Sequence, residues 1–438
     1  MIRNYITQAL TMMRQHKLFT GIYIGGTAIS LALAMTLFMM FHLKLSPAYP
    51  EYERNRTLNF GGVDFTDFEP KTHDNLVKFL GTKLSGYFAS EKIVEIDGVE
   101  MVALTTSCDI TLVSTPKEKE AGRAGLLSEP KCVDANYWRM FNFEFIHGAS
   151  FTADELCDAK AVVSESFAKA LFARSDVMGE KLILDNKEEC IIVGVVRDAL
   201  PCMTNTKYDV YFPLHYSAFK KGQNNLWESI YTSYDAIITY SRGADVKKIK
   251  EEIDNRYRRY VWEKVQEDGI TSFDYKIHMM ENWEYALACP ENSTIWDAIK
   301  KYFYIVLAFL FIPALNLSGM IASRMNSRLA EIGVRKAYGA TNAQILWQVL
   351  CENLFLTLIG SVLGLVLSYT ITITFFEYIY TIISGYTPDY DIPVEMLFSP
   401  RIFVLTLLLC VLLNIASALL PALFALKKNI VQSLYNKR

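Results

Sequence analysis

Four apolar stretches without any charged side chain constrain this chain more than any other feature. Each has about 20–25 residues, enough to cross a hydrocarbon core of about 30 Å as a helix. The polar residues 44–300 separate the first stretch from the other three. We therefore expect a membrane protein with four transmembrane α-helices in a 1 + 3 layout and a large domain inserted after the first helix. The four stretches are Phe19–Leu43, Tyr302–Ala322, Asn353–Phe376 and Ile402–Leu426.

The charges beside these stretches predict their orientation. Lys and Arg dominate before the first stretch, between the second and third, and after the fourth, whereas acids dominate between the third and fourth. Basic loops stay on the cytoplasmic side, so we expect a multi-pass membrane protein with both termini in the cytoplasm and the large domain outside it. The formal net charge of −3 gives no reason to expect nucleic acid as a partner.

The termini and the spans define the expected parts of the chain. Residues 1–17 have one apolar and one polar helical face, which is typical of an interfacial amphipathic helix; the alternative is a plain cytoplasmic extension of the first span. The first stretch is too long for a signal-peptide core and lacks a good cleavage site after it, which favours an uncleaved anchor. The parts are 1–17, span 18–43, the extracytoplasmic domain 44–300, span 301–322, the cytoplasmic elbow 323–345, span 346–380, an extracytoplasmic loop 381–400, span 401–426 and a cytoplasmic tail 427–438.

Strand and helix patterns alternate within the large domain, which indicates an α+β fold. Ser164 is placed to cap a helix, and residues 246–261 carry an apolar stripe at helical spacing. The segment 134–145 is rich in aromatic residues and is expected in the core, whereas Asp64, Asp67 and Glu69 fit a solvated loop. The expected strands are Val99–Leu104, Ala161–Val163, Cys190–Val196, Tyr208–Leu214 and Ala236–Tyr240.

Six of the eight cysteines lie in this domain. In an oxidising compartment they could form disulfide bonds. No pair has the spacing of a redox or metal motif, and six cysteines allow 15 connectivities. The alternative, that they are small buried apolar residues, stays open. The six are Cys108, Cys132, Cys157, Cys190, Cys202 and Cys289.

The basic segment between the second and third apolar stretches has strong local signals. An amphipathic helix is expected through Lys336, and Gly339 is placed to end it in the left-handed conformation. Thr341 and Gln344 form a capping box that starts another helix at once. Two helices therefore meet at a tight elbow. The second should run unbroken into the third span and extend from Asn342 to about Tyr380, which makes it longer than the bilayer core.

Small residues recur at intervals of four in two of the spans. They are Gly26 and Ser30 in the first span, and Gly360, Gly364 and Ser368 in the third. Such faces let membrane helices approach closely. Packing among the helices of one chain and a homodimer seam are both consistent with this pattern.

Motifs of several enzyme classes do not occur. The sequence has no G-x-x-x-x-G-K-[ST], so ATP is not expected to bind through a P-loop. It also lacks H-E-x-x-H and G-x-S-x-G, and its six histidines are scattered. We therefore expect no catalytic residues, no metal and no cofactor in this chain.

The elbow resembles the signature of the FtsX-like, MacB-type ABC transporter permeases. The resemblance continues into the third span and the end of the fourth, and into three segments of the large domain, so it covers essentially the whole chain. One departure lies at Asn429–Gln432, where the family often has proline. The matching segments are Arg328–Thr341, Gln348, Glu352, Gly360, Gly364, Pro421–Lys427, Tyr137–Phe143, Val162–Phe172 and Gly179–Lys181.

The resemblance implies a permease that works with a separate cytoplasmic ABC ATPase dimer, which would bind the ATP and magnesium. It also implies a second permease copy or a paralogue, and in some systems a periplasmic adaptor. Family members export or extract peptides, lipoproteins or macrolides by mechanotransmission; the alternative is a regulator of a cell-wall hydrolase or sensor. The residues that would couple to the ATPase are Arg328, Glu331, Ile332, Gly333, Arg335, Lys336, Gly339 and Thr341.

Overall fold

The computed structural model describes most of the large domain and two long helices. It covers residues 17–69, 88–122, 125–156, 158–185, 187–200, 202–215, 234–267, 272–288 and 334–384, with short pieces between 300 and 419. The chain forms two compact units, residues 45–292 and residues 1–44 with 293–438. The expected interfacial helix, second span, C-terminal tail and elbow residues 328–333 lie outside the described residues.

The unit 45–292 is built on one mixed sheet. Among the described residues it has twelve strands in the order β12-β1-β11-β2-β5-β10-β7-β9-β8-β3-β4, with β6 pairing with β9. Most neighbours are antiparallel, and two pairs, β10 with β5 and β7 with β9, are parallel. The strands are β1 Thr57–Glu69, β2 Val99–Ser107, β3 Thr111–Ser114, β4 Leu126–Ser128, β5 Pro130–Val133, β6 Phe145–Gly148, β7 Lys160–Ser164, β8 Lys181–Leu184, β9 Glu188–Val196, β10 Val210–Pro213, β11 Asp235–Tyr240 and β12 Ser272–Glu281.

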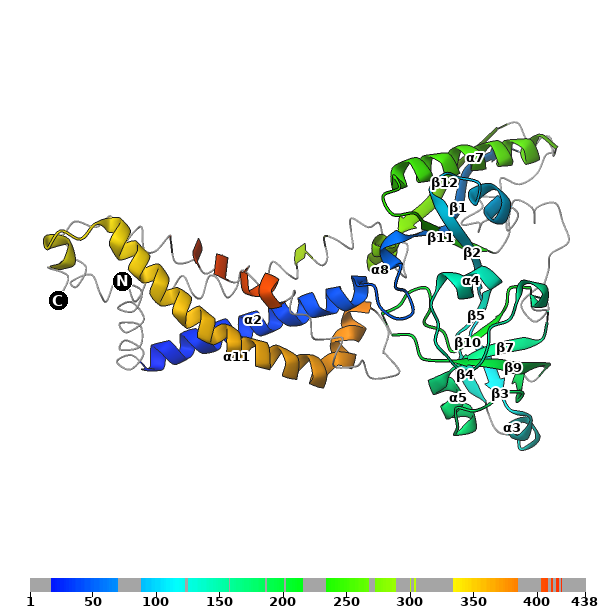
Figure 1. The fold of residues 1–438 in the computed structure, drawn as a ribbon, viewed down its shortest axis with the longest axis horizontal. Helices are drawn as coiled ribbons and strands as arrows, with labels where there is room; N and C mark the ends of the chain where they lie inside the picture. The colour runs from blue at the N-terminus through cyan, green and yellow to red at the C-terminus, as the bar shows by residue number, and fades with distance from the viewer. Residues whose placement is uncertain are drawn as a thin grey trace. The chain divides into compact units, whose positions relative to one another are not determined.

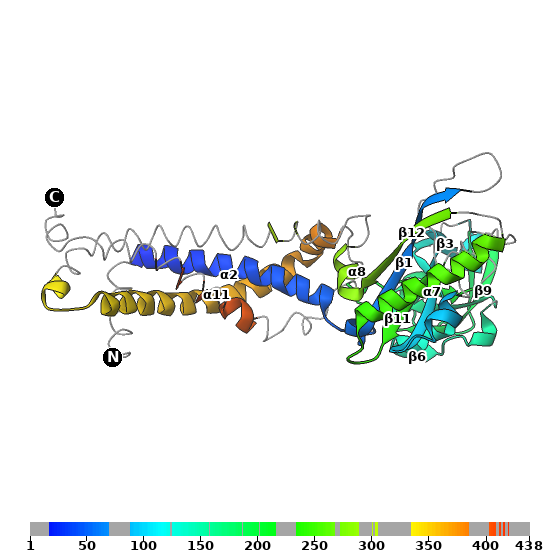
Figure 2. The same ribbon diagram turned by 90° about the horizontal axis from the view of Figure 1, so that it is seen from above.

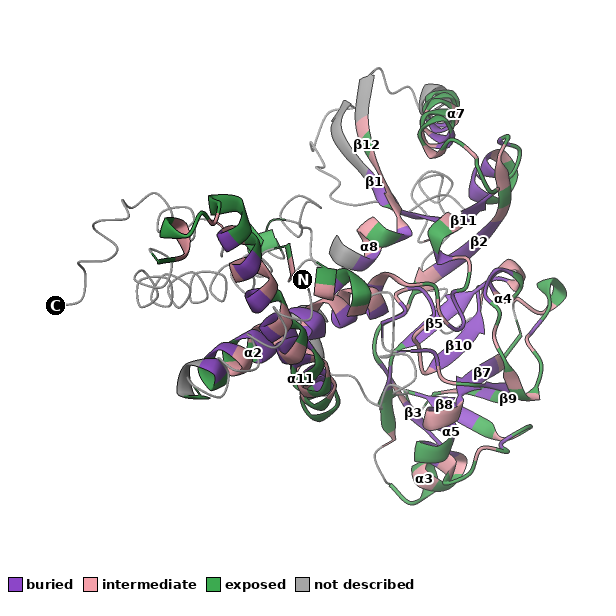
Figure 3. Cartoon of the chain, turned by 60° about the vertical axis from the view of Figure 1, so that its left-hand side comes forward, coloured by how far each residue is buried: buried purple, intermediate pink, exposed green. Residues whose placement is uncertain are grey.

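One lobe of this unit consists of β12, β1, β11 and β2, with α7 (Val246–Glu267) and η2 (Phe88–Ile93) packed on them (Figure 1). The stripe expected on α7 is confirmed, because Ile249, Ile253, Tyr257 and Val261 are all buried. The opposite face of α7 is largely exposed (Figure 3). This amphipathic pattern explains why α7 is a helix that lies against a sheet.

The second lobe contains the remaining strands, with α4 (Ala135–Met140), α5 (Glu165–Phe172) and α3 (Pro116–Glu120). The predicted cap of α5 is confirmed, since the Phe167 amide donates to Ser164 Oγ at 3.3 Å. The aromatic segment forms α4 and the turn after it. Tyr137 of this segment is fully buried, and its ring centroid lies 4.8 Å from that of Phe141 and 6.0 Å from that of Tyr211.

The two lobes share the sheet through a short seam between β2 and β5. Three residue pairs form this ladder: Thr105 with Val133, Thr106 with Cys132, and Ser107 with Lys131. Asp134 reinforces the seam, because one carboxylate oxygen accepts from the amide of Leu104 in β2 while the other caps α4 at the amide of Tyr137. Burial raises the pKa of Asp134 to about 6 against these hydrogen bonds.

The other unit contains α2 (Lys17–Leu45) and α11 (Asn342–Ser384). Among the described residues these are the two helices long and apolar enough to cross a membrane. Both views show them side by side (Figures 1 and 2). α11 has 43 residues, with a break in helical geometry at Phe375, and at about 1.5 Å per residue it is roughly 65 Å long. It therefore exceeds the hydrocarbon core, as the sequence predicts.

Candidate functional site

The elbow before α11 has the geometry that its sequence predicts. Gly339 has φ +90°, and the amide of Ala340 donates to the carbonyl of Arg335 at 3.0 Å. This hydrogen bond is typical of a helix that ends with a glycine in the left-handed conformation, here Gly339. Thr341 and Gln344 then form the reciprocal capping box, at 3.0 and 3.3 Å. The change of direction is thus fixed by backbone and cap geometry.

A row of polar side chains joins the elbow to the first turns of α11. Arg335 Nη1 donates to Gln348 Oε1, and Gln348 Nε2 donates to Glu352 Oε1 at 3.0 Å. Gln348 and Glu352 are buried. By contrast, Tyr338 is 89% exposed and Trp347 is 61% exposed. The elbow is therefore held rigidly to α11 and presents two large aromatic side chains.

The glycines of α11 lie against α2. A Cβ atom on Gly364 would be 2.8 Å from the carbonyl oxygen of Ala28, and one on Gly360 would be 3.0 Å from Thr27 Cβ. Ser368 Oγ lies 3.9 Å from Met35 Sδ. Gly26 and Ser30 do not face α11 in the described part of the chain: a Cβ on Gly26 would meet no described atom within 4 Å, and Ser30 Oγ donates to the Gly26 carbonyl.

Gly364→Leu is expected to destabilise the α2–α11 pair by about 1–3 kcal/mol or more, because there is no space for a side chain there. The measurement is the temperature at which the purified chain loses monodispersity in mild detergent. Gly21→Leu is the matched control on α2, since nothing lies within 4 Å of its Cβ position. Equal losses in the two variants would contradict a specific contact at Gly364.

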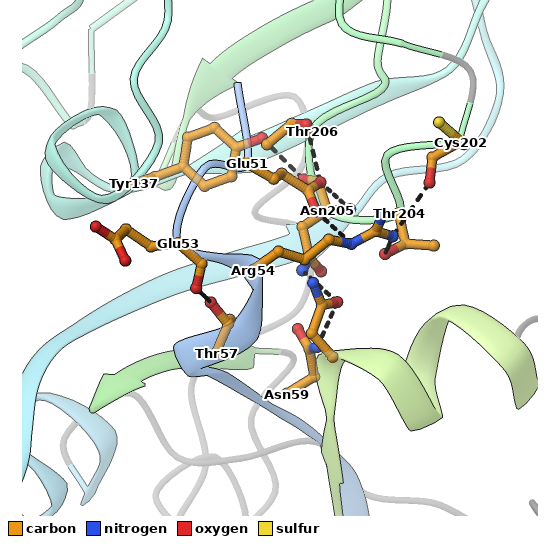
Figure 4. Close-up of polar contacts among 11 residues, drawn as sticks. Glu51, Glu53, Arg54, Thr57, Asn59, Tyr137, Cys202, Thr204, Asn205 and Thr206 are labelled. Atoms are coloured by element: carbon orange, nitrogen blue, oxygen red, sulfur yellow. Dashed lines mark hydrogen bonds and ion pairs between the residues drawn. The ribbon is translucent and has the colours of Figure 1, made fainter. Parts of the chain in front are cut away.

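A second candidate site lies where the chain enters the unit 45–292 after α2. We call it the root cluster: Glu51, Arg54, Asn59, Thr204, Asn205, Thr206 and Asn282 (Figure 4). Arg54 belongs to η1 (Arg54–Arg56), and its Nε lies 3.3 Å from Glu51 Oε2. The side chains of this ion pair are 2% and 1% exposed. Sequence analysis missed the cluster, although the spacing Glu51-x-x-Arg54 after Pro50 was a weak signal.

The ion pair holds a loop that follows β9. Arg54 Nη2 donates to the carbonyl of Cys202 at 3.1 Å and to Thr204 Oγ1 at 3.4 Å. Glu51 Oε1 accepts from the amide of Asn205 and from Thr206 Oγ1, both at 2.9 Å. The aromatic core extends to the same loop, because Tyr137 donates its hydroxyl to the Asn205 carbonyl at 2.8 Å.

Three asparagines connect this loop to the segment that leads back towards the second apolar stretch. Asn59 and Asn205 each direct an amide nitrogen at Asn282 Oδ1, at 3.3 and 3.5 Å. Asn282 begins α8 (Asn282–Ala288). The chain segment that enters the unit, the segment that leaves it and the loop after β9 therefore meet in one buried polar cluster.

Some buried polar atoms of the cluster lack hydrogen-bond partners. In the described part of the chain, Arg54 Nη1 and Asn282 Nδ2 are buried and have no hydrogen-bond partner. A buried ion pair contributes little to net stability, although loss of one partner is costly. The arrangement is therefore better suited to fixing the relative positions of the three segments than to stabilising the fold.

A small polar cavity of about 230 Å³ adjoins the cluster at Asn59 and Asn205. Its wall includes Lys131, whose Nζ lies 3.8 Å from Asp235 Oδ2 and 5.3 Å from the ring centroid of Tyr208. Burial alone would lower the pKa of Lys131, but Tyr208 and Asp235 raise it, so the amine is charged. Pockets for drug-sized ligands measure about 300–1,000 Å³, so this cavity is too small for such a molecule. The described residues contain no cluster of possible metal ligands.

Comparison with known proteins gives two family matches. The model of the MacB-like periplasmic core domain matches residues 20–256, more than half of the chain. The model of the FtsX-like permease C-terminal domain matches residues 303–430.

Individual relatives agree with these matches. The ABC transporter permease YknZ of Bacillus subtilis is 23% identical over 63% of this chain and 63% of its own length. The macrolide export ATP-binding/permease protein MacB of Aggregatibacter actinomycetemcomitans is 26% identical over 54% of this chain and 34% of its own length. The chain thus spans about a third to two thirds of the length of these relatives.

Among solved structures, a domain of a permease protein from Porphyromonas gingivalis covers 53% of this chain and 92% of its own, at 18% identity and a TM-score of 0.37. Together these matches confirm the resemblance noted at the elbow and in the aromatic segment. The chain belongs to the FtsX-like ABC transporter permeases that carry a MacB-like periplasmic core domain.

Proposed function

We propose that this chain is the permease subunit of a transporter in which a separate cytoplasmic ABC ATPase dimer supplies the work. ATP and magnesium would be bound by that partner, and two permease chains, identical or paralogous, would assemble in the lipid bilayer. The proposed topology has four spans, both termini in the cytoplasm and the unit 45–292 in the periplasm. The proposed task is export or extraction of a peptide, lipoprotein or drug-like molecule, with or without a periplasmic adaptor.

The observation that carries this proposal is the rigid connection from the elbow into α11. Hydrogen bonds restrict rotation between the elbow and the helix. They are those at the Gly339 helix end, the capping box at Thr341 and the Arg335–Gln348–Glu352 row. Movement imposed on the elbow by a docked ATPase would therefore move α11. The exposed Tyr338 and Trp347 provide the kind of aromatic surface that is enriched in protein interfaces.

In the proposed mechanism, the movement of α11 is then transmitted to α2. The two helices approach closely at Gly360 and Gly364, and side-chain hydroxyls add contacts at Tyr23 with Thr357 and at Thr36 with Thr372, both at 3.4 Å. α2 ends at Leu45, and the chain reaches Glu51 of the root cluster six residues later.

The decisive experiment is purification of the full chain in mild detergent with identification of the proteins that accompany it. We expect an ABC ATPase, and we expect its hydrolysis rate to rise when it is bound to the permease. Glu331→Lys should abolish that stimulation or release the ATPase, because Glu331 is the only acid among the basic elbow residues.

Glu120→Lys is the matched control, since it makes the same charge change at an exposed position of α3 and should leave the stimulation unchanged. Full stimulation in Glu331→Lys would contradict docking at the elbow. If a cell-wall hydrolase or a sensor kinase accompanies the purified chain, the result would instead support the alternative, a transmembrane regulator driven by the same movement.

A further inference from the structure

Two cysteine side chains meet at the seam between the lobes. Cys132 lies in β5, opposite Thr106 of β2, and Cys108 follows the end of β2. Both are present as thiols, and their sulfur atoms are 3.0 Å apart. A disulfide bond is about 2.05 Å long, so the two sulfurs need to approach by only about 1 Å.

The local geometry explains why the two side chains meet. Cys108 is two residues beyond the strand partner of Cys132, which makes the pair diagonal neighbours across an antiparallel ladder. Diagonal side chains in such a ladder are within reach of one another. The chain leaves β2 after Ser107, which frees Cys108 from strand geometry.

The surroundings favour a stable bond once it has formed. Cys132 is fully buried in the core with Val113, Cys190 and Val210, and Cys108 packs against this core. Cys108 is partly exposed and so can be reached by another protein. Hydrogen bonding to Cys108 and burial raise the pKa of the Cys132 thiol, and the adjacent ammonium group of Lys131 offsets this only in part.

We propose that Cys108 and Cys132 are oxidised to a structural disulfide bond in the mature protein. The oxidant is the disulfide of an exported thiol–disulfide oxidoreductase, because the family places this domain in the periplasm. The Cys108 thiolate attacks one sulfur of that disulfide, and the Cys132 thiolate then displaces the oxidoreductase from Cys108. Two protons and two electrons leave the cysteine pair, and the oxidoreductase disulfide becomes a dithiol.

The bond would strengthen the ladder of three residue pairs that joins the two lobes. On the opposite face of the ladder, Lys131 Nζ already lies 3.3 Å from Ser107 Oγ. A covalent link beside this contact would fix the end of β2 to β5. The two lobes would then move as one body when the root cluster is displaced.

The test is differential alkylation of the full chain, isolated from membranes with N-ethylmaleimide present from lysis onwards and then denatured without reductant. After reduction, iodoacetamide labels the sulfurs that were bonded, and peptide mapping assigns each label. We expect the second label, from iodoacetamide, on Cys108 and Cys132 in nearly all molecules. The first label, N-ethylmaleimide, should be found on Cys351 in α11 and on Cys190. In the described part of the chain, Cys190 has no cysteine sulfur in hydrogen-bond contact.

N-ethylmaleimide on both Cys108 and Cys132 in the wild type would overturn the proposal. In Cys132→Ser, Cys108 should change to the first label. Persistence of the second label there would show a bond to another cysteine and would also overturn it. Because labelling is done on denatured protein, these results do not depend on whether the variant folds.

Discussion

Arg54→Met is expected to lower the free energy of unfolding of the unit 45–292 by about 3–5 kcal/mol. The variant leaves the Glu51 carboxylate buried, with two hydrogen bonds and no opposite charge. It also frees the carbonyl of Cys202 and the hydroxyl of Thr204 from their donor. Urea unfolding of the isolated fragment 45–292 measures the effect, since these residues form a compact unit of their own.

Two further variants sharpen this test. Arg197→Met breaks an exposed ion pair with Glu144, whose side chains are 58% and 61% exposed, and should cost no more than about 1 kcal/mol. The double variant Glu51→Gln with Arg54→Met removes both charges and should recover part of the loss. If Arg54→Met is as mild as Arg197→Met, the root cluster does not hold the three segments together.

Gly339→Val is expected to abolish stimulated ATP hydrolysis in the complex with the ATPase. Gly339 has φ +90°, and a β-branched residue resists that conformation, at a cost of about 1–3 kcal/mol. The helix end would be forced to refold locally, and the elbow would no longer meet α11 at a fixed angle. The measurement is the ATP hydrolysis rate of the ATPase alone, with the wild-type permease and with the variant.

Gly122→Val is the control for backbone strain alone. Gly122 also has a positive φ, +66°, with nothing within 4 Å of its Cβ position, but it follows α3 in the other unit. It should lower stability and leave coupling intact. Undiminished stimulation in Gly339→Val would reduce the elbow to a connector and contradict the proposed coupling.

Local features of the sequence predicted local structure well. The cap at Ser164, the stripe on α7, the left-handed Gly339 and the capping box at Thr341 are all confirmed. Each depends on residues within a few positions of one another. The short helix α3 has the same kind of local signal, since Thr115 and Glu118 form a capping box.

The strand β1 was missed for a physical reason. Asp64, Asp67 and Glu69 were expected in a solvated loop, but they lie on β1, paired with β12 more than 200 residues later. Register shifts between Phe60 and Gly62 and between Phe65 and Asp67 interrupt the alternation of side chains. Period-two patterning therefore fails here as a signal.

The root cluster could not be predicted for a related reason. Glu51 and Arg54 are ordinary charged residues until the sheet brings the loop at Thr204 and the first residue of α8 to them. The spacing Glu51-x-x-Arg54 allows an ion pair within one helical turn, but it does not indicate that the pair is buried. The family resemblance did not indicate the cluster either, because its matching segments lie elsewhere in the chain.

The length of α11 has a mechanical consequence. From Asn342 to the break at Phe375 the helix has 34 residues (375 − 342 + 1), which is roughly 50 Å at about 1.5 Å per residue. A rigid rod of that length acts as a lever, so a tilt of about 10° at the elbow displaces the far end by about 9 Å. The break at Phe375 provides a joint at that end, where the large displacement can be redirected. In the proposed mechanism, small rearrangements at a docked ATPase would be amplified across the bilayer.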